Sequence, residues 1–171
     1  YGYLASTRIN ALAAHHQRRV NWRPVLLGPM FKAAGTAPLA GVPLKGPYSV
    51  HDFSRTARFL GIRYKQPQNF PISTQNAARA FYWINDRDAL RAHRFAAACF
   101  ESYFTKDMDI TTADVVADIA AAVGEDRAAA LAATADPVFK DRLKSEVESA
   151  LARGVFGSPF IIVDGEPFWG N

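Results

Sequence analysis

Apolar residues recur at two different spacings in the first third of the chain. Residues 20–27 alternate between apolar and polar side chains and predict a strand, which Pro24 would place at an edge or a bulge. A short helix is expected over 30–34 and a longer one from Val50 to Leu60, ended by Gly61, with an ordered loop over 35–47 between them. A first helix is predicted over residues 3–16, where the helical spacing joins Ala5, Ile9, Leu12 and Ala13.

The middle of the chain reads as a block of helices that follows a proline-containing loop over 62–72. Each helix has an apolar stripe and residues typical of helix ends. The predicted helices run from a cap at Ser73 or Thr74 to Ile84, from Ala89 to Tyr103, from a cap at Thr111 to the residue before Gly124, and from a cap at Asp136 to the residue before Gly154.

Residues 160–169 read as a β-hairpin, in which 160–163 and 166–169 are strands and Asp164-Gly165 is the turn. Ser158-Pro159 precedes the first strand, and a cis peptide there could leave the backbone N–H and C=O of Ser158 free at a sheet edge. Free edge groups can pair with an extended peptide. An ordinary trans proline at the start of a strand fits the pattern equally well.

The composition of the chain excludes several classes of protein and of functional site. The chain has 171 residues, a formal net charge of +4 and dispersed basic residues, so it predicts one globular domain, with or without an insertion, and no nucleic-acid tract. The single Cys99 excludes an intrachain disulfide, and its apolar neighbours predict a buried core thiol. The histidines have no companion ligands at metal spacing, so we expect no metal site. No apolar run approaches the roughly 20 residues that span a bilayer, and the absence of a signal peptide favours the cytoplasm.

One family accounts for motifs along nearly the whole chain. The stretch GVFGSPFIIVDGEPFW resembles the cis-proline hairpin of thioredoxin-like proteins that carry an inserted helical domain. Among these proteins, the 2-hydroxychromene-2-carboxylate isomerases and the kappa-class glutathione transferases are the most similar. The other matching segments, in order, are YGYLAS, GPMFKAAGTAP, GVPLKGPYSVHDFSRTARFLGI, PQNFP, ITTADVVADIAAAVG and DPVFKDRLKSEVESALARGVFGSP.

The resemblance implies an α/β, thioredoxin-like fold with an inserted α-helical domain. Residues 1–34 and 155–171 would form the thioredoxin-like domain, and residues 35–154 the inserted loop and helical domain. The family's first strand and catalytic serine are expected before Tyr1, and its closing helix after Asn171. A homodimer is also expected.

The resemblance further implies glutathione as the cofactor and a small aromatic carboxylate as the substrate. The residues that would bind glutathione are Tyr1, Thr36 (where many relatives have Asn), Pro43, Lys45, Ser158, Pro159 and Asn171. The positive end of a helix starting near Tyr1 would stabilise a thiolate there. In the substrate pocket, Lys32 or Lys45 would face the carboxylate and Asn69 could donate a hydrogen bond, while Trp169 and Tyr48 could shape the walls; anchoring the loop fits Tyr48 equally well.

Three functions follow from these observations. The first is glutathione-dependent interconversion of 2-hydroxychromene-2-carboxylate and trans-o-hydroxybenzylidenepyruvate, a step in naphthalene breakdown. The second is a kappa-like glutathione transferase that acts on electrophiles, and the third is a non-catalytic thioredoxin-like binding protein. Gly2 stands where a dithiol oxidoreductase of this fold needs its second cysteine, so exchange by a C-x-x-C pair is disfavoured.

Overall fold

The computed structural model describes residues 1–170, and the longest stretches without helix or strand are 16–26 and 60–74. In chain order, the elements are α1 (Gly2–Ser6), α2 (Ile9–His15), α3 (Leu27–Ala33), the 3₁₀ helix η1 (Leu39–Gly41), α4 (Lys45–Phe59), α5 (Gln75–Asn85), α6 (Ala89–Lys106), α7 (Ala113–Ala122), α8 (Arg127–Ala135), α9 (Pro137–Ala152), β1 (Phe160–Val163) and β2 (Glu166–Trp169). Within residues 1–170 the sheet consists of β1 and β2 alone, so the described chain is largely helical.

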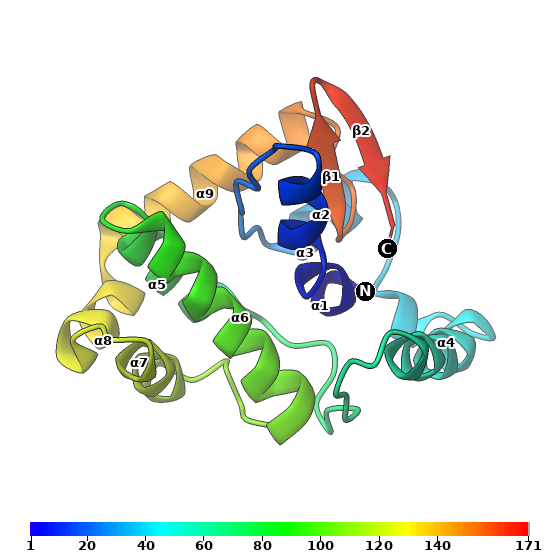
Figure 1. Ribbon diagram of the computed structural model, residues 1–171, viewed down its shortest axis with the longest axis horizontal. Coiled ribbons are helices and arrows are strands. Elements are labelled where there is room, and N and C mark those ends of the chain that lie inside the picture. The colour runs from blue at the N-terminus through cyan, green and yellow to red at the C-terminus, as the bar shows by residue number, and fades with distance from the viewer. Residues whose placement is uncertain (171) are drawn as a thin grey trace.

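Helices α5 to α9 form a block in which α5 lies against each of the other four helices. Small alanine side chains let these helices approach closely, and larger apolar side chains fill the space between them. In Figure 1 the block occupies one side of the molecule and α4 the other, with α1 and the hairpin between them. The largest fully buried side chains of the block are Phe81, Tyr82, Ile84, Phe95 and Val116.

Four helices of the block begin with a side-chain cap, and the cap of α9 is the one that the sequence predicts. The side chain of Asp136 accepts a hydrogen bond from the amide of Val138 (2.8 Å), with Pro137 in the first turn. Two predictions were wrong in detail. Thr112 rather than Thr111 caps α7, and α8, which Asp126 caps, was not predicted at all. Six of the nine residues in its sequence, RAAALAATA, are alanine, so the apolar stripe used to find the other helices is weak there.

The N-terminal predictions need the largest correction. The helix expected over 3–16 is broken at Thr7 and Arg8 into α1 and α2. The hydroxyls of Ser6 and Thr7 donate to the carbonyls of Tyr3 (2.7 Å) and Leu4 (2.8 Å) one turn back, and such local bonds compete with helix continuation.

The strand expected over 20–27 is absent from the described structure, because no neighbouring strand pairs with it there. Side chains hold this segment instead. The Tyr82 hydroxyl donates to the carbonyl of Pro24 (2.6 Å), and Arg23 forms an ion pair with Glu146 (2.9 Å). The short helix expected over 30–34 is confirmed as α3, which starts earlier, at Leu27.

Helix α4 confirms the stripe that ends at Gly61, but it begins at Lys45 rather than near Val50. Pro47 fits its first turn because proline has no N–H to satisfy there. Gly46 is required for close approach: a Cβ at this position would lie 2.3 Å from the carbonyl oxygen of Ala40 in η1. The loop expected over 35–47 is therefore ordered but shorter than predicted.

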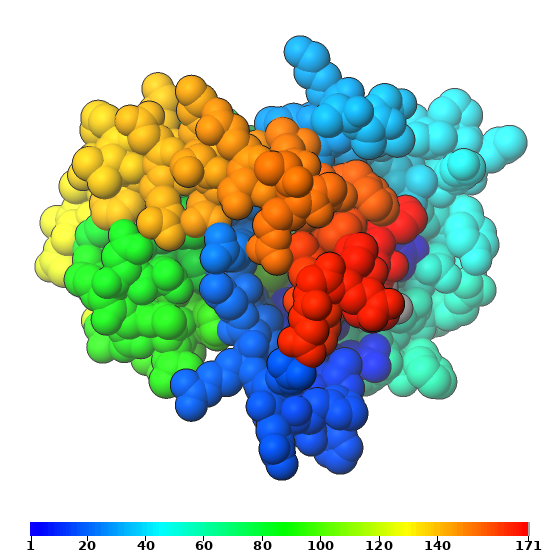
Figure 2. Space-filling view, turned by 90° about the horizontal axis from the view of Figure 1, so that it is seen from above, coloured from blue at the N-terminus to red at the C-terminus, as the bar shows by residue number. Residues whose placement is uncertain are grey.

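The hairpin is confirmed at its predicted residues. Phe160 pairs with Trp169 and Val163 with Glu166, and Asp164 and Gly165 form the turn with φ values of 51° and 92°. All four residues of β2 are exposed, and Figure 2 shows the hairpin on the surface. No helix among residues 1–170 has the length and apolar character needed to cross a bilayer.

Candidate functional site

Ser158 is placed at the start of the hairpin, against the beginning of α1. Its peptide bond to Pro159 is cis, which decides between the two alternatives left open by the sequence. The Ser158 hydroxyl oxygen lies 2.9 Å from the point where a Cβ on Gly2 would stand, so α1 and the hairpin meet here. Ser158 is exposed, and neither its backbone N–H nor its C=O is hydrogen-bonded within residues 1–170. These groups are therefore available to a ligand.

Tyr1 lies beside this contact and is held through a network that the sequence did not reveal. Its hydroxyl donates to Oδ2 of Asp52 in α4 at 2.7 Å, and Arg55 forms a short ion pair with the same carboxylate. The hydrogen bonds from Tyr1 and then Arg55 lower the pKa of Asp52. Burial, followed by the bond to Asp52, raises the pKa of Tyr1, which stays protonated and cannot serve as a base at neutral pH.

Three predicted glutathione residues belong to one segment that leads into α4. Thr36, Pro43 and Lys45 are all exposed. The Lys45 amide donates to the carbonyl of Pro43 (2.7 Å), and Leu44 between them has φ 65° and ψ −47°. This is a γ-turn of the rare, strained form, and it carries a leucine that is 90% exposed. In Figures 1 and 2 the start of α1, the end of β2 and the segment leading into α4 converge on one side of the molecule.

The predicted substrate residues are distributed more widely. Trp169 packs edge-on against Phe156 and lies beside Gly157, next to Ser158, with its side chain 65% exposed. Tyr48 is exposed on α4, where its hydroxyl accepts a hydrogen bond from Arg55 at 3.2 Å.

The two remaining substrate candidates lie on other segments. Lys32 is exposed in the last turn of α3. Asn69 is exposed in the loop after α4, and its carbonyl is bonded by the Tyr103 hydroxyl. No hydrogen bond within residues 1–170 joins the side chain of Lys32 or Asn69 to Ser158. The glutathione candidate Asn171 lies outside the described residues.

An aromatic cluster extends from Tyr1 towards the loop that holds Asn69. The Phe53 ring lies 5.5 Å from that of Tyr1 and 5.8 Å from that of Phe104, and Phe104 lies 6.4 Å from Phe70 (centroid distances). Phe70 is 46% exposed and precedes Pro71, to which it is joined by a second cis peptide that was not predicted. Phe53 and Phe104 are buried, so the cluster joins Tyr1 to the core and exposes its apolar surface at Phe70.

The field at the N-terminus of the first helix is weaker than the sequence predicts. The positive end expected near Tyr1 belonged to a helix running to residue 16, whereas α1 ends at Ser6. Because a macrodipole is the sum of aligned peptide dipoles, five residues supply a weaker field than the predicted helix would. The stabilisation of an anion at this position would depend more on hydrogen-bond donors than on the helix.

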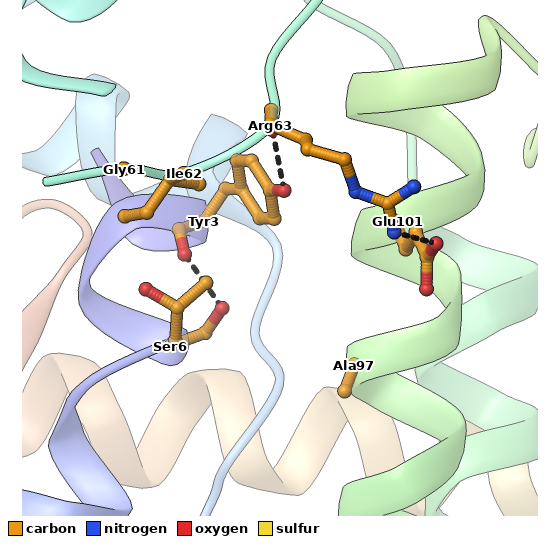
Figure 3. Close-up of a pocket in the computed structure, with 8 residues that line it drawn as sticks. Tyr3, Ser6, Gly61, Ile62, Arg63, Ala97 and Glu101 are labelled. Carbon is orange, nitrogen blue, oxygen red and sulfur yellow. Dashed lines mark hydrogen bonds and ion pairs between the residues drawn. The ribbon is translucent and has the colours of Figure 1, made fainter. Parts of the chain in front are cut away.

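The cavities lie away from these residues. A cavity of about 370 Å³ is lined by residues of α1, of α6 and of the loop after α4. Figure 3 shows the Tyr3 hydroxyl donating to the carbonyl of Arg63 (2.8 Å) and Arg63 paired with Glu101 (2.7 Å) beside it. None of the predicted site residues lines this cavity. No cluster of His, Cys, Asp or Glu within residues 1–170 is arranged to hold a metal ion.

The cis-proline hairpin beside the first turn of α1, joined to a large helical block, defines a thioredoxin-like protein of the DsbA kind. The family model for the DSBA-like thioredoxin domain matches residues 1–171, and the chain belongs to this family.

Two relatives are similar over nearly the full chain. A 2-hydroxychromene-2-carboxylate isomerase of Sphingobium xenophagum is 25% identical over 173 residues, which cover 100% of this chain and 87% of that protein. A solved structure of a 2-hydroxychromene-2-carboxylate isomerase superposes with a TM-score of 0.87 at 22% identity, covering 99% of this chain and 82% of its own.

A third protein shares the fold at lower similarity. A crystal structure described as a candidate protein disulfide isomerase, from Nitrosomonas europaea, superposes with a TM-score of 0.70 at 12% identity, covering 97% of this chain and 80% of its own. The family and the DsbA-like fold are thus established for this chain.

Proposed function

We propose that the protein is a glutathione-dependent isomerase that interconverts 2-hydroxychromene-2-carboxylate and trans-o-hydroxybenzylidenepyruvate. The observation that carries the proposal is the exposed Ser158, whose backbone groups are unbonded within residues 1–170 and which lies against Gly2 in α1. The full-length similarity to an isomerase of that name supports the choice of reaction. In this proposal residues 1–34 and 155–171 form an α/β thioredoxin-like domain, and residues 35–154 are inserted into it.

The described residues have the chemistry that glutathione requires. The tripeptide has an extended backbone and a free carboxylate at each end, so a binding site needs free backbone groups and cations. The N–H and C=O of Ser158 supply the first, since both are free to pair with the cysteinyl residue as an added strand would. Lys45 supplies an exposed cation on the glycyl side, with Thr36 and Pro43 along the same segment.

The candidate site residues would take different roles in the proposed reaction. Bound glutathione would supply a thiolate, a nucleophile that can add to a conjugated substrate. Tyr1, which follows the expected catalytic serine, forms one wall of the sulfur site with its ring fixed by Asp52 and Phe53. Phe70, Trp169 and Tyr48 offer exposed apolar surface to an aromatic substrate, and Lys32 and Asn69 remain candidates for its polar groups.

Calorimetric titration of glutathione into the full-length protein tests the cofactor. We expect one-to-one saturable binding that Lys45→Ala weakens about tenfold, because a charge-assisted hydrogen bond is lost. Lys106→Ala, an exposed lysine at the end of α6, is the matched control and should not change the affinity. Ser158→Ala keeps the backbone groups and should retain binding. Equal affinities for the Lys45 and Lys106 variants would remove Lys45 from the site.

An absorbance assay on 2-hydroxychromene-2-carboxylate tests the reaction. The proposal requires that the two isomers interconvert while the glutathione concentration stays constant. Consumption of glutathione with electrophiles, without isomerisation, would instead identify a transferase. A protein that does not bind millimolar glutathione would be a non-catalytic thioredoxin-like binding protein or an isomerase that works without glutathione, and the absorbance assay without glutathione separates these two. We also propose that the protein is a cytoplasmic homodimer, and sedimentation analysis tests the oligomeric state.

A further inference from the structure

The proposed glutathione site is divided between two parts of the molecule. Residues 36–59, called here the arm, comprise the loop with η1 and helix α4, and they carry Thr36, Pro43 and Lys45. Tyr1 and Ser158 belong to the rest of the molecule, called here the body. A tripeptide bound across both parts needs the arm to be held at a fixed distance from Ser158, so the arm-to-body contacts are functionally important.

The arm has few contacts that could fix its position. Among the helices and strands of residues 1–170, α4 makes extensive contacts with η1, which belongs to the arm itself. The apolar contact with the body involves Ala57, which is 1% exposed, and Phe53, whose ring lies 5.5 Å from that of Tyr1 and 5.8 Å from that of Phe104 in α6. Figure 1 shows α4 standing apart from the helical block. An apolar contact of this kind is not directional and sets no register by itself.

Backbone hydrogen bonds join the arm to the body at its two ends, from Thr36 to Phe31 and from Ile62 to Ala57. Far from those ends, the directional contact between arm and body is the hydrogen bond from the Tyr1 hydroxyl to Asp52. It spans 2.7 Å and joins residues 51 positions apart in the sequence. Arg55, one turn further along α4, pairs with the other carboxylate oxygen and also donates to the Tyr48 hydroxyl at 3.2 Å. The Asp52 side chain is only 23% exposed, so the bond is partly shielded from water. The lowered pKa of Asp52 keeps it ionised and able to accept both bonds at neutral pH.

We infer that Asp52 is a positioning residue that, through Tyr1, holds the arm in register with the body so that Lys45 and Ser158 face the same glutathione molecule. This inference rests on the proposed function. Asp52 does not touch the tripeptide in this arrangement. It acts through Tyr1 on one side and through the start of α4 on the other, and Arg55 fixes the carboxylate between them.

Glutathione affinity and hydrogen exchange, measured on the same variants of the full-length protein, test this inference. Asp52→Ala and Tyr1→Phe should each weaken glutathione binding about tenfold. The double variant should be no weaker than either single one, because both remove the same bond. Asp52→Asn keeps an oxygen that can accept from Tyr1 and should recover most of the affinity. Arg58→Ala, exposed on the same helix, is the control and should not change the affinity.

Hydrogen exchange without ligand gives a second readout that does not depend on the proposed function. The amides of Lys45 and Gly46, which donate to the carbonyls of Pro43 and Val42, should exchange faster in Asp52→Ala than in Arg58→Ala. A lower melting temperature with unchanged glutathione affinity and exchange would show that Asp52 is merely structural and would overturn the inference.

The wild-type protein separates the two possible failures. If wild type does not bind glutathione, the proposed function fails and the role of Asp52 in it falls as well. If wild type binds but the Asp52 and Tyr1 variants bind equally well, the proposed function stands and the inference alone is wrong. Additive losses in the double variant would also contradict it, since they would mean two independent contacts.

Discussion

The helical block and the hairpin region differ in how their structure is maintained. In α5 to α9 Phe81, Tyr82, Ile84, Phe95 and Val116 are fully buried, and side-chain caps close four of the helix starts. In the hairpin all four residues of β2 are exposed, and α1 beside it has five residues. The block is therefore the stable scaffold, whereas the candidate site lies where few contacts oppose local movement. The predictions that follow compare the two regions, from the largest expected effect to the smallest.

Removing a large core side chain should have the greatest effect. Phe95→Ala should lower the free energy of unfolding by about 4 kcal/mol, because the residue is fully buried in α6 and leaves a cavity. Leu90→Ala, 71% exposed on the same helix, should cost less than about 0.5 kcal/mol. Phe168→Ala in the hairpin, 49% exposed, should cost less than about 1 kcal/mol. Urea unfolding measures all three, and equal costs for Phe95 and Phe168 would contradict the contrast.

The reactivity of Cys99 should show how tightly the block is closed. Burial raises the pKa of its thiol to about 12, so hardly any thiolate is present at pH 8. Alkylation should be on the order of a thousandfold slower in the folded protein than in urea. The raised pKa also makes the free energy of unfolding depend on pH. Stability is unaffected below the ordinary thiol pKa and falls as the pH rises towards 12, because only the unfolded chain ionises. Rapid labelling at pH 8 under native conditions would mean that the block opens readily.

The contact between the helical block and residues 20–26 should depend on the carboxylate of Glu146. Glu146, whose side chain is 9% exposed, accepts hydrogen bonds from Arg23 (2.9 Å) and Arg142 (3.0 Å). Glu146→Ala should cost about 2 kcal/mol because both cations lose their partner. Glu148→Ala on the same helix is the control, since its pair with Lys144 is exposed and 4.0 Å long, and its cost should be close to zero. Thermal melts measure both variants, and equal melting temperatures would show that the ion pairs of Glu146 do not stabilise the fold.

Helix caps should have the smallest effect. Asp136→Ala should cost about 1 kcal/mol, because the Val138 amide loses its acceptor. Thr74→Ala should cost clearly less, because the Thr74 side chain makes no capping bond at the start of α5. Similar losses at the two positions in urea unfolding would mean that helix starts in the block are held by packing alone.

The sequence predicted the elements whose signals are local. Asp136 and Pro137 mark the start of α9, Asp164-Gly165 marks the hairpin turn, and both are confirmed. The prediction failed where partners or local competition decide. A strand at 20–27 needs a neighbouring strand that the described residues lack, and the hydroxyls of Ser6 and Thr7 break a helix that the apolar stripe made continuous.

For the site, the sequence identified residue types but not all their partners. Ser158-Pro159 and Lys45 stood out by motif and by resemblance, but nothing local indicated that Asp52 accepts a hydrogen bond from Tyr1. On helical spacing alone Asp52 is an ordinary polar position of α4. The sequence also does not show which phenylalanines of α4 are buried. Phe59 is 87% exposed, whereas Phe53 is buried.

The sequence by itself determined the helical block, the hairpin and the single buried thiol, because capping, turn chemistry and apolar periodicity act over a few residues. The family followed from the resemblance of its motifs to those of known proteins. Only the tertiary structure decided which backbone groups stay free at Ser158, where α1 ends and how the arm is joined to the body. Those features depend on contacts between distant segments, such as Tyr1 with Asp52 and Gly2 with Ser158, and local sequence patterns do not encode such distances.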